Sequence, residues 1–233
     1  MRLAIISDIH SNLEALSATL RLIESESVDH IVCLGDIVGY GADPDPCVEL
    51  VRGRCDVVVQ GNHDAAVVRT EIADSFTANA RSAVFWTHRH ISPENLSYLA
   101  RLPLQRTLSD ILFVHASPCE PDQWHYIVDA EDAQTAFRCF TETLCFVGHS
   151  HFPGIYDQRG RIAALHRNGR MLVNVGSVGQ PRDRDPRLSF GVLDTEDWSY
   201  RNVRAPYDIE TAAQKILSAE LPRSLANRLF VGT

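Results

Sequence analysis

The chain has 233 residues, of which 45% are hydrophobic and 22% are charged, and its formal net charge is −8. This length and composition suffice to bury the core of one α/β domain, and we expect residues 1–233 to form a single domain. The acidic balance argues against an extensive nucleic-acid surface. No apolar run approaches the roughly 18 residues that a membrane span requires, so we expect no membrane association.

The cysteine pattern indicates a reducing environment. The six cysteines include no C-x-x-C pair, and several lie in apolar stretches such as IVCLG and LCFVG. The apolar run at residues 1–7 is too short for the hydrophobic region of a signal peptide, which favours a cytoplasmic location. We expect buried, reduced thiols at Cys33, Cys47, Cys55, Cys119, Cys139 and Cys145.

The first part of the chain alternates strands with helices. Apolar runs predict strands at 2–7, 30–35 and 56–61, and leucines at helical spacing predict a helix after Asn12, a plausible N-cap. Two prolines open a further helix over 44–52. Continuous apolar strands that alternate with helices indicate a parallel sheet covered on both faces.

The middle of the chain is more helical and its end is richer in short strands. Residues 76–101 predict two helices that break before Pro93, and 129–140 predict another between strands at 111–117 and 144–148. After the strand at 144–148, five short runs separated by Gly, Asn and Asp predict an antiparallel meander: GIYDQ, RIAAL, RMLVNVG, LSFGVLD and WSYRNVR. One or two helices are expected to close the chain.

Ligand-type side chains follow five of the predicted strands. Singly, each has an ordinary explanation as a turn, a cap or a buried histidine with a partner. Because the carboxyl ends of parallel strands lie at one edge of a sheet, five such coincidences together indicate a site at that edge. The residues are Asp8, His10, Asp36, Asn62, His63, Asp64, His115, His149 and His151.

These side chains have the chemistry of a metal site. Carboxylate, imidazole and amide oxygen without cysteine suit borderline-hard ions rather than a structural thiolate zinc site. The potential ligands are too many for one ion and fit two ions that share a carboxylate. We therefore expect two divalent metal ions, with Mn²⁺, Fe²⁺/³⁺, Zn²⁺ and Ni²⁺ as candidates.

The motifs D-x-H, G-D, G-N-H-D, a lone H and G-H-x-H occur here in an order that resembles the calcineurin-like metallophosphoesterases. The segment NVGSVGQPRD (174–183) is similar to one in the small YfcE-like phosphodiesterases. The resemblance implies an α/β protein, a four-layer α/β/β/α sandwich with two mixed β-sheets and a dinuclear metal site at the C-terminal edge of the strands. It assigns metal one to Asp8, His10, Asp36 and His151, and metal two to Asp36, Asn62, His115 and His149.

Two further residues complete the expected catalytic set. His63 is expected to protonate the leaving-group oxygen or donate a hydrogen bond to it, with Asp64 orienting the ring. The alternative is that Asp64 caps a turn and His63 is a spare ligand. Asn12, Tyr40 and Arg182 are candidate substrate contacts, against the alternatives of a helix N-cap, packing and a solvated loop.

The expected function is a dinuclear metal-dependent phosphoesterase that hydrolyses a phosphodiester or phosphomonoester of a small molecule or nucleotide, by in-line attack of a metal-bridging hydroxide. The alternatives are a Ser/Thr phosphoprotein phosphatase, a dinucleoside tetraphosphatase or a non-catalytic scaffold. Gln60 stands where the protein phosphatases usually have arginine, which disfavours that class. The loops 40–47, 118–128 and 180–188 are expected to set specificity.

Overall fold

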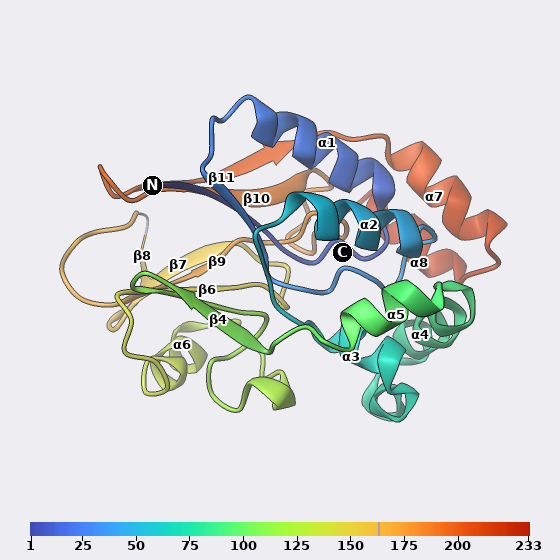
Figure 1. Cartoon of the computed structure of the whole chain (residues 1–233), viewed down its shortest axis with the longest axis horizontal. Coiled ribbons are helices and arrows are strands. Elements are labelled where there is room, and N and C mark those ends of the chain that lie inside the picture. The colour runs from blue at the N-terminus through green and yellow to red at the C-terminus, as the bar shows by residue number, and fades with distance from the viewer. Residues whose placement is uncertain (163) are drawn as a thin grey trace.

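Two mixed β-sheets lie face to face in the computed structural model, which describes residues 1–162 and 164–233 (Figure 1). The first sheet has the order β11-β10-β1-β2-β3, with β1, β2 and β3 parallel and β10 and β11 antiparallel to their neighbours. Its strands are β1 (Arg2–Ile6), β2 (His30–Cys33), β3 (Val57–Val58), β10 (Leu188–Asp194) and β11 (Ser199–Ala205).

The second sheet has the order β4-β5-β6-β9-β7-β8. Its central strands β5, β6 and β9 are parallel, and the outer strands β4, β7 and β8 pair antiparallel. The bounds are β4 (Gln105–Leu108), β5 (Ile111–Val114), β6 (Leu144–Val147), β7 (Gly154–Asp157), β8 (Gly160–Ile162) and β9 (Met171–Asn174).

Helices cover the outer faces of both sheets and one end of the molecule. The helices α1 (Leu13–Glu24) and α2 (Pro44–Arg54) lie over the first sheet, and α6 (Ala130–Ala136) lies over the second (Figure 1). This is the four-layer α/β/β/α arrangement that the motifs implied. The remaining helices are α3 (Asn62–Val68), η1 (Thr70–Ser75), α4 (Ala78–His90), α5 (Pro93–Leu99), η2 (Pro121–Gln123), α7 (Ile209–Ser218) and α8 (Arg223–Leu229).

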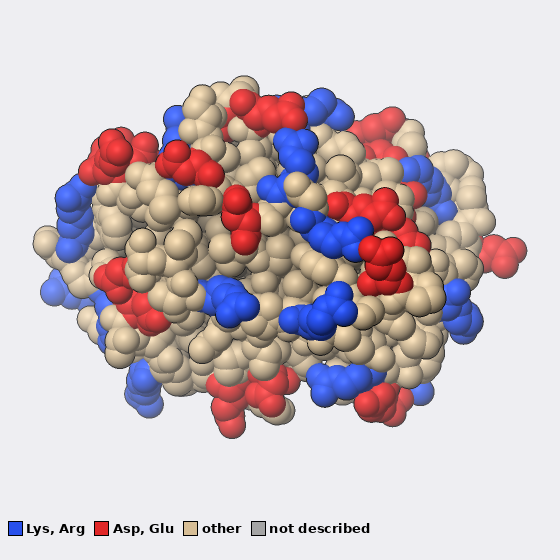
Figure 2. Space-filling model, viewed as in Figure 1, with Lys and Arg blue, Asp and Glu red and all other residues tan. Residues whose placement is uncertain are grey.

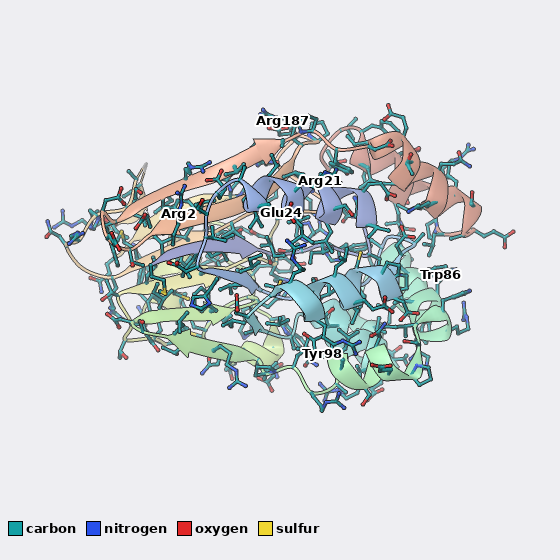
Figure 3. All side chains as sticks on the ribbon, turned by 45° about the horizontal axis from the view of Figure 1, so that its top comes forward. Arg2, Arg21, Glu24, Trp86, Tyr98 and Arg187 are labelled. Carbon is teal, nitrogen blue, oxygen red and sulfur yellow. A yellow bond between two sulfur atoms is a disulfide. The ribbon has the colours of Figure 1, made fainter. Side chains whose placement is uncertain are left out.

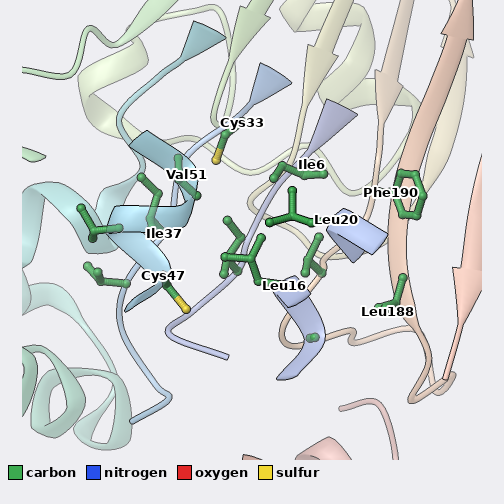
Figure 4. Close-up of a cluster of buried hydrophobic side chains, with 14 of the residues drawn as sticks. Ile6, Leu16, Leu20, Cys33, Ile37, Cys47, Val51, Leu188 and Phe190 are labelled. Carbon is green, nitrogen blue, oxygen red and sulfur yellow. The ribbon is translucent and has the colours of Figure 1, made fainter. Parts of the chain in front are cut away.

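Alternating side chains of the strands build three cores, one between the sheets and one on the outer face of each sheet. On β1, Leu3 and Ile5 face the core between the sheets, while Ala4 and Ile6 face α1 and α2. Figure 4 shows Ile6 beside the leucines of α1 in this outer core. Because successive strand residues point to opposite faces, one apolar run fills both layers.

Charged residues of both signs are mixed on the surface. On the face drawn in Figure 2, Lys and Arg lie interspersed with Asp and Glu rather than in one field. In Figure 3, Trp86 of α4 lies toward the right-hand end of the molecule and Tyr98 of α5 lies along its lower side. Among the described residues, no helix has the length and apolar character needed to cross a membrane.

The strands and helices predicted for the first 150 residues are confirmed in type and order. The predicted meander is confirmed only in part: β7 pairs antiparallel with β8 and β9, and β10 with β11, but the five runs are divided between the two sheets. β9 is an inner strand that pairs parallel with β6, and β10 joins the first sheet beside β1. Both are buried over nearly their whole length, which suits a central position rather than a solvent-facing hairpin. The run RIAAL extends beyond β8 into residue 163, which lies outside the described residues.

The expectation of six reduced thiols is also wrong. Cys119, in the loop after β5, forms a disulfide with Cys139, just beyond α6. These two cysteines lie outside the apolar strands and near the surface, so they are not packed into the core as the cysteines of the apolar runs are. The other four are free thiols, of which Cys33, Cys47 and Cys145 are buried.

We predict that replacing both disulfide cysteines, Cys119→Ser and Cys139→Ser, lowers the free energy of unfolding. A cross-link over a sequence separation of 20 residues restricts the unfolded chain and stabilises by about 3 kcal/mol. Urea unfolding followed by circular dichroism, with and without reductant, measures the effect. Reductant should destabilise the natural chain and leave the double variant unchanged. A titration of the unreduced, denatured chain that finds six thiols rather than four would contradict the cross-link.

Candidate active site

The seven predicted metal ligands come together where the two sheets meet. Asp8, His10, Asp36 and Asn62 follow β1, β2 and β3 of the first sheet, and the other three histidines follow β5 and β6 of the second. All are buried. Donor atoms lie within 4.8 Å of one another in three groups: Asp8, His10 and His151; Asp36, His115 and His149; and His10, Asp36 and His63.

The carboxylate of Asp36, a member of the second group, also lies close to the first group. Its Oδ2 is 3.6 Å from Nε2 of His10 and 3.5 Å from Nε2 of His115. On the far side of His10, Nε2 of His151 lies 3.2 Å from Oδ1 of Asp8. Asp36 therefore occupies the position that a shared ligand of two ions requires.

Backbone carbonyls fix the orientation of three of the histidines. Nδ1 of His10 donates to the carbonyl of Val38 (3.2 Å), and Nδ1 of His151 donates to that of Gln180. Nδ1 of His115 donates to the carbonyl of Leu34 at 2.9 Å. Because a carbonyl only accepts, each Nδ1 holds a proton, and each Nε2 faces the interior of the site, where it offers a lone pair when the ring is neutral.

The donor set fits divalent cations. Nε2 of His10 lies 3.2 Å from Nε2 of His151, so two nitrogen lone pairs face each other. Oδ1 of Asp8 and Nε2 of His149 are buried and, among the described residues, have no hydrogen-bond partner. Buried polar atoms without partners are costly, and a cation bound by mixed nitrogen and oxygen donors would satisfy all of them.

Burial and neighbouring charges set different protonation states within the cluster. Burial favours a neutral acid, yet the imidazoles of His115 and His63 hold the pKa of Asp36 well below its usual range. Burial lowers the pKa of His149 to about 3. Burial also disfavours the imidazolium of His115, but Asp36 beside it raises that pKa to about 9. Metal ligands must be deprotonated, so Asp36 and His149 are ready to bind, whereas His115 must release a proton.

Most of the predicted ligands have positive φ angles, in the left-handed region of the backbone. The φ angles are 54° at Asp8, 52° at His10, 50° at Asp36, and 62° at both His149 and His151. Such conformations cost about 1–3 kcal/mol each in residues other than glycine and gather at functional sites. The amides of Ile9 and His10 both donate to the carbonyl of Asp36, which holds two of these turns against each other.

Two glycines let the strand ends approach closely. A Cβ at Gly61 would lie 2.1 Å from Oδ1 of Asp36, and one at Gly148 would lie 2.4 Å from Oδ2 of Asp8. Both distances are far below van der Waals contact. The glycines of G-N-H-D and G-H-x-H therefore make room for the carboxylates.

The stretch G-N-H-D is the first turn of α3 and not a free turn. Gly61 is the N-cap, and its amide donates to Oδ2 of Asp64 at 3.0 Å. Oδ1 of Asp64 accepts from the amides of Ile37 (2.9 Å) and Val38 (3.2 Å). The expected contact between Asp64 and the ring of His63 is not formed, because the carboxylate is occupied by backbone amides of a helix start and of the loop after β2.

His63 forms part of a cavity wall next to the ligands. Its ring packs against Tyr40, with centroids 4.4 Å apart, and against Phe76 at 5.0 Å. The cavity, of about 680 Å³, is also lined by the ligands Asn62 and His149. A group bound there lies next to both the ligands and His63.

The three candidate substrate contacts differ in where they point. Asn12 caps α1 through Oδ1, which accepts from Ala15 at 3.1 Å, while its Nδ2 donates to Gly179 at 2.8 Å. Its amide is therefore fully used, as the N-cap alternative required. The ring of Tyr40 lies 4.6 Å from that of His10, and its hydroxyl accepts from Arg182 at 3.2 Å.

Several residues of the site were not foreseen from the sequence. The ring of Tyr126 stacks on His149 with centroids 4.0 Å apart, and Trp124 and Phe76 line the cavity with it. Trp124 and Tyr126 belong to the loop 118–128, whose aromatic content could have drawn attention to them. Phe76 and Arg228, which lies near Tyr40, had no local signal.

Comparisons with known proteins agree with this geometry. An uncharacterized protein of Methanocaldococcus jannaschii is 41% identical over 241 residues, which cover 99% of this chain and 98% of that protein. The crystal structure of a metallophosphoesterase from Sphaerobacter thermophilus is 39% identical, with a TM-score of 0.90 over 100% of this chain and 99% of its own. A hypothetical protein of Pyrococcus horikoshii, 20% identical, shares the fold with a TM-score of 0.84 over 100% of this chain and 98% of its own.

The sequence profile of the calcineurin-like phosphoesterase superfamily domain matches residues 1–198 of the chain. The match spans every strand end that contributes a predicted ligand. The resemblance inferred from the order of the motifs is confirmed. The chain belongs to the calcineurin-like phosphoesterase superfamily.

Proposed function

We propose that this protein hydrolyses a phosphodiester or phosphomonoester of a small molecule or nucleotide. The observation that supports it is the convergence of two carboxylates and four inward-facing imidazoles beside a cavity that His63 lines. Aromatic side chains of Tyr40, Phe76 and Trp124 line the same cavity, which suits an organic leaving group. A cytoplasmic location is part of the proposal on the strength of the four free thiols, whereas the Cys119–Cys139 disulfide argues against it, because disulfides are rare in that compartment.

We assign two ions to the cluster, one held by Asp8, His10, Asp36 and His151 and the other by Asp36, Asn62, His115 and His149. Divalent ions in such a pair supply Lewis acidity toward phosphate oxygens and lower the pKa of a bound water. Mn²⁺ is the ion we would test first, because the mixed nitrogen and oxygen donors suit it.

His63 is the residue we assign to the leaving group. It follows the ligand Asn62 directly, yet its side chain forms the cavity wall together with Tyr40. From there its ring can donate a proton or a hydrogen bond to an oxygen that leaves into the cavity. Asp64 acts instead as a positioning residue, since its carboxylate joins the loop of Asp36 to the start of α3.

A phosphoprotein phosphatase is the less favoured substrate class. The side chain of Gln60 donates to the carbonyl of Leu99 at 2.8 Å and is buried, so this position offers no cation to a phosphate. A non-catalytic scaffold is less favoured because the ligands and His63 are all in place.

Mn²⁺ binding provides the first test of the assignment. After removal of metal with a chelator, the protein should bind about two equivalents of Mn²⁺ and its thermal midpoint should rise, because the ions bind only the folded state. Asp36→Asn should reduce both the stoichiometry and the rise, since Asp36 contacts both groups. Asp122→Asn, at an exposed cavity residue, serves as the matched control and should bind as the natural chain does.

Hydrolysis of bis-p-nitrophenyl phosphate and p-nitrophenyl phosphate with Mn²⁺ tests the activity. We expect His63→Gln to keep both ions while kcat falls about 10²–10⁴-fold, the usual contribution of a positioned acid. His90→Gln, on the exposed part of α4, is the control and should be fully active. Loss of an ion along with activity would make His63 a ligand. Silence on both substrates with two ions bound would favour the scaffold.

Asp64→Asn tests the structural role of this carboxylate. The substitution puts an amide donor among three backbone amides, so at least one buried N–H loses its acceptor. We expect the free energy of unfolding to fall by about 1–3 kcal/mol and the Mn²⁺ affinity to fall with it. Urea unfolding and a metal titration measure the two effects. Unchanged stability with a loss of kcat alone would instead support the orientation of His63 by Asp64.

A further inference from the structure

Two arginines from distant segments converge on one tyrosine beside the site. The guanidinium carbons of Arg182 and Arg228 lie 5.8 Å and 5.9 Å from the centre of the Tyr40 ring. Arg182 belongs to the loop 180–188, and Arg228 belongs to α8 near the end of the chain. Arg182 also donates to the hydroxyl of Tyr40 at 3.2 Å.

The same two guanidinium groups share a single acceptor. Oε1 of Gln180 accepts from Arg182 at 3.3 Å and from Arg228 at 3.2 Å. Gln180 is only 2% exposed, and its backbone carbonyl accepts from Nδ1 of His151. One buried residue thus fixes both arginines and one of the assigned ligands.

Among the residues that the structure describes, no carboxylate forms an ion pair with either arginine of this pair. Nearby, Arg187 is paired with Asp185 and Arg204 with Asp183. Within residues 1–162 and 164–233, Arg182 and Arg228 donate only to neutral groups and form no ion pair with an acid. Two like charges held against one oxygen repel each other, and an anion bound between them would remove that cost.

Burial increases the energetic cost of these two unpaired positive charges. Both arginines are partly buried, so solvent screens their charges only in part. Burial, followed by the neighbouring charge of Arg182, lowers the pKa of Arg228. A phosphate group satisfies such a pair well, because planar guanidinium groups donate two parallel hydrogen bonds to phosphate oxygens.

The arginines and the cavity lie beside different parts of the ligand cluster. The cavity is lined by Asn62 and His149, which belong to the assigned second ion. The arginines are linked to the first ion's ligands, through Gln180 to His151 and through the ring of Tyr40 to His10. A phosphate at the ions can therefore direct its leaving group to the cavity and another substituent to the arginines.

We propose that Arg182 and Arg228 form a subsite for a second phosphate group of the substrate, next to the phosphate that is hydrolysed. This inference rests on the proposed function and narrows it to substrates in which the hydrolysed phosphate bears a further phosphate, as in a nucleoside diphosphate or a longer polyphosphate. Neither arginine is assigned to the chemistry itself. Both select the substrate.

Isothermal titration of the full chain loaded with Mn²⁺ tests the subsite without turnover. Methylphosphonate and methylenediphosphonate are a matched, non-hydrolysable pair that differ by one phosphonate group. The natural chain should bind the diphosphonate more tightly. Arg182→Gln and Arg228→Gln should each lose about tenfold or more of this preference, the usual effect of one charge-assisted contact, while the affinity for methylphosphonate changes little.

Arg223→Gln is the matched control, because it removes the same charge from an exposed position of the same helix. It should keep the preference of the natural chain. Metal content and the urea midpoint are measured for every variant, so that lost ions or lost folding are not mistaken for lost contacts. Arg228→Lys, which keeps the charge but not the planar fork, should retain part of the preference and replaces the glutamine variant if that one does not fold.

Two results would overturn the subsite. One is a natural chain that binds the two phosphonates with equal affinity. The other is an equal loss of affinity for both ligands in the arginine variants, which would mean that the guanidinium groups act on the hydrolysed phosphate itself. Retained preference in a protein that hydrolyses no phosphate ester would refute the proposed function and leave the subsite standing.

Discussion

The site depends on a buried polar junction between the two sheets. The amide of His149, beyond β6, donates to Oδ2 of Asp8, beyond β1, at 3.0 Å. Nδ1 of His115, beyond β5, donates to the carbonyl of Leu34, beyond β2, at 2.9 Å. Buried polar groups are stable only when they are paired, so these bonds fix the separation and register of the two sheet edges. The apolar core between the sheets holds the two sheets together, and the hydrogen bonds of the junction determine the positions of the predicted ligands.

This junction contains strained backbone and unfavourable contacts between lone pairs. Five ligands have positive φ angles, and the ring nitrogens of His10 and His151 face each other across 3.2 Å. Sequences usually agree with their fold at every level, and departures from that agreement gather at functional sites. A cation among the donors would satisfy the facing ring nitrogens and the unpartnered side-chain atoms. We therefore expect ion binding and folding stability to be coupled in this protein, because bound ions would oppose the cost of assembling the cluster.

Signals that lie within one segment of sequence were sufficient to predict much of this structure. Each ligand follows a short apolar run, and both the run and the polar residue after it can be recognised without their neighbours. Pairings between distant segments could not be predicted in the same way. The partners of β9 and β10, the bond from Asp64 to Ile37, and the disulfide of Cys119 all join segments that only the folded chain brings together. Gly61 and Asp64 look like a turn in sequence because the same residues that favour turns also begin helices.

The strand ends position the predicted metal ligands, and the loops contribute side chains around them. The predicted ligands directly follow strands whose pairing and cores leave little freedom, whereas four of the residues around them come from three loops and one helix. Tyr40 belongs to the loop 40–47, Tyr126 to 118–128 and Arg182 to 180–188, and Arg228 belongs to α8. Tyr40 links the arginines to the cluster, since its ring packs against the rings of His10 and His63 and lies close to the guanidinium groups of Arg182 and Arg228. Substitutions in these loops and in α8 are therefore expected to alter what is bound more than how the metal-ligand cluster is held, except at Gln180, whose carbonyl orients His151.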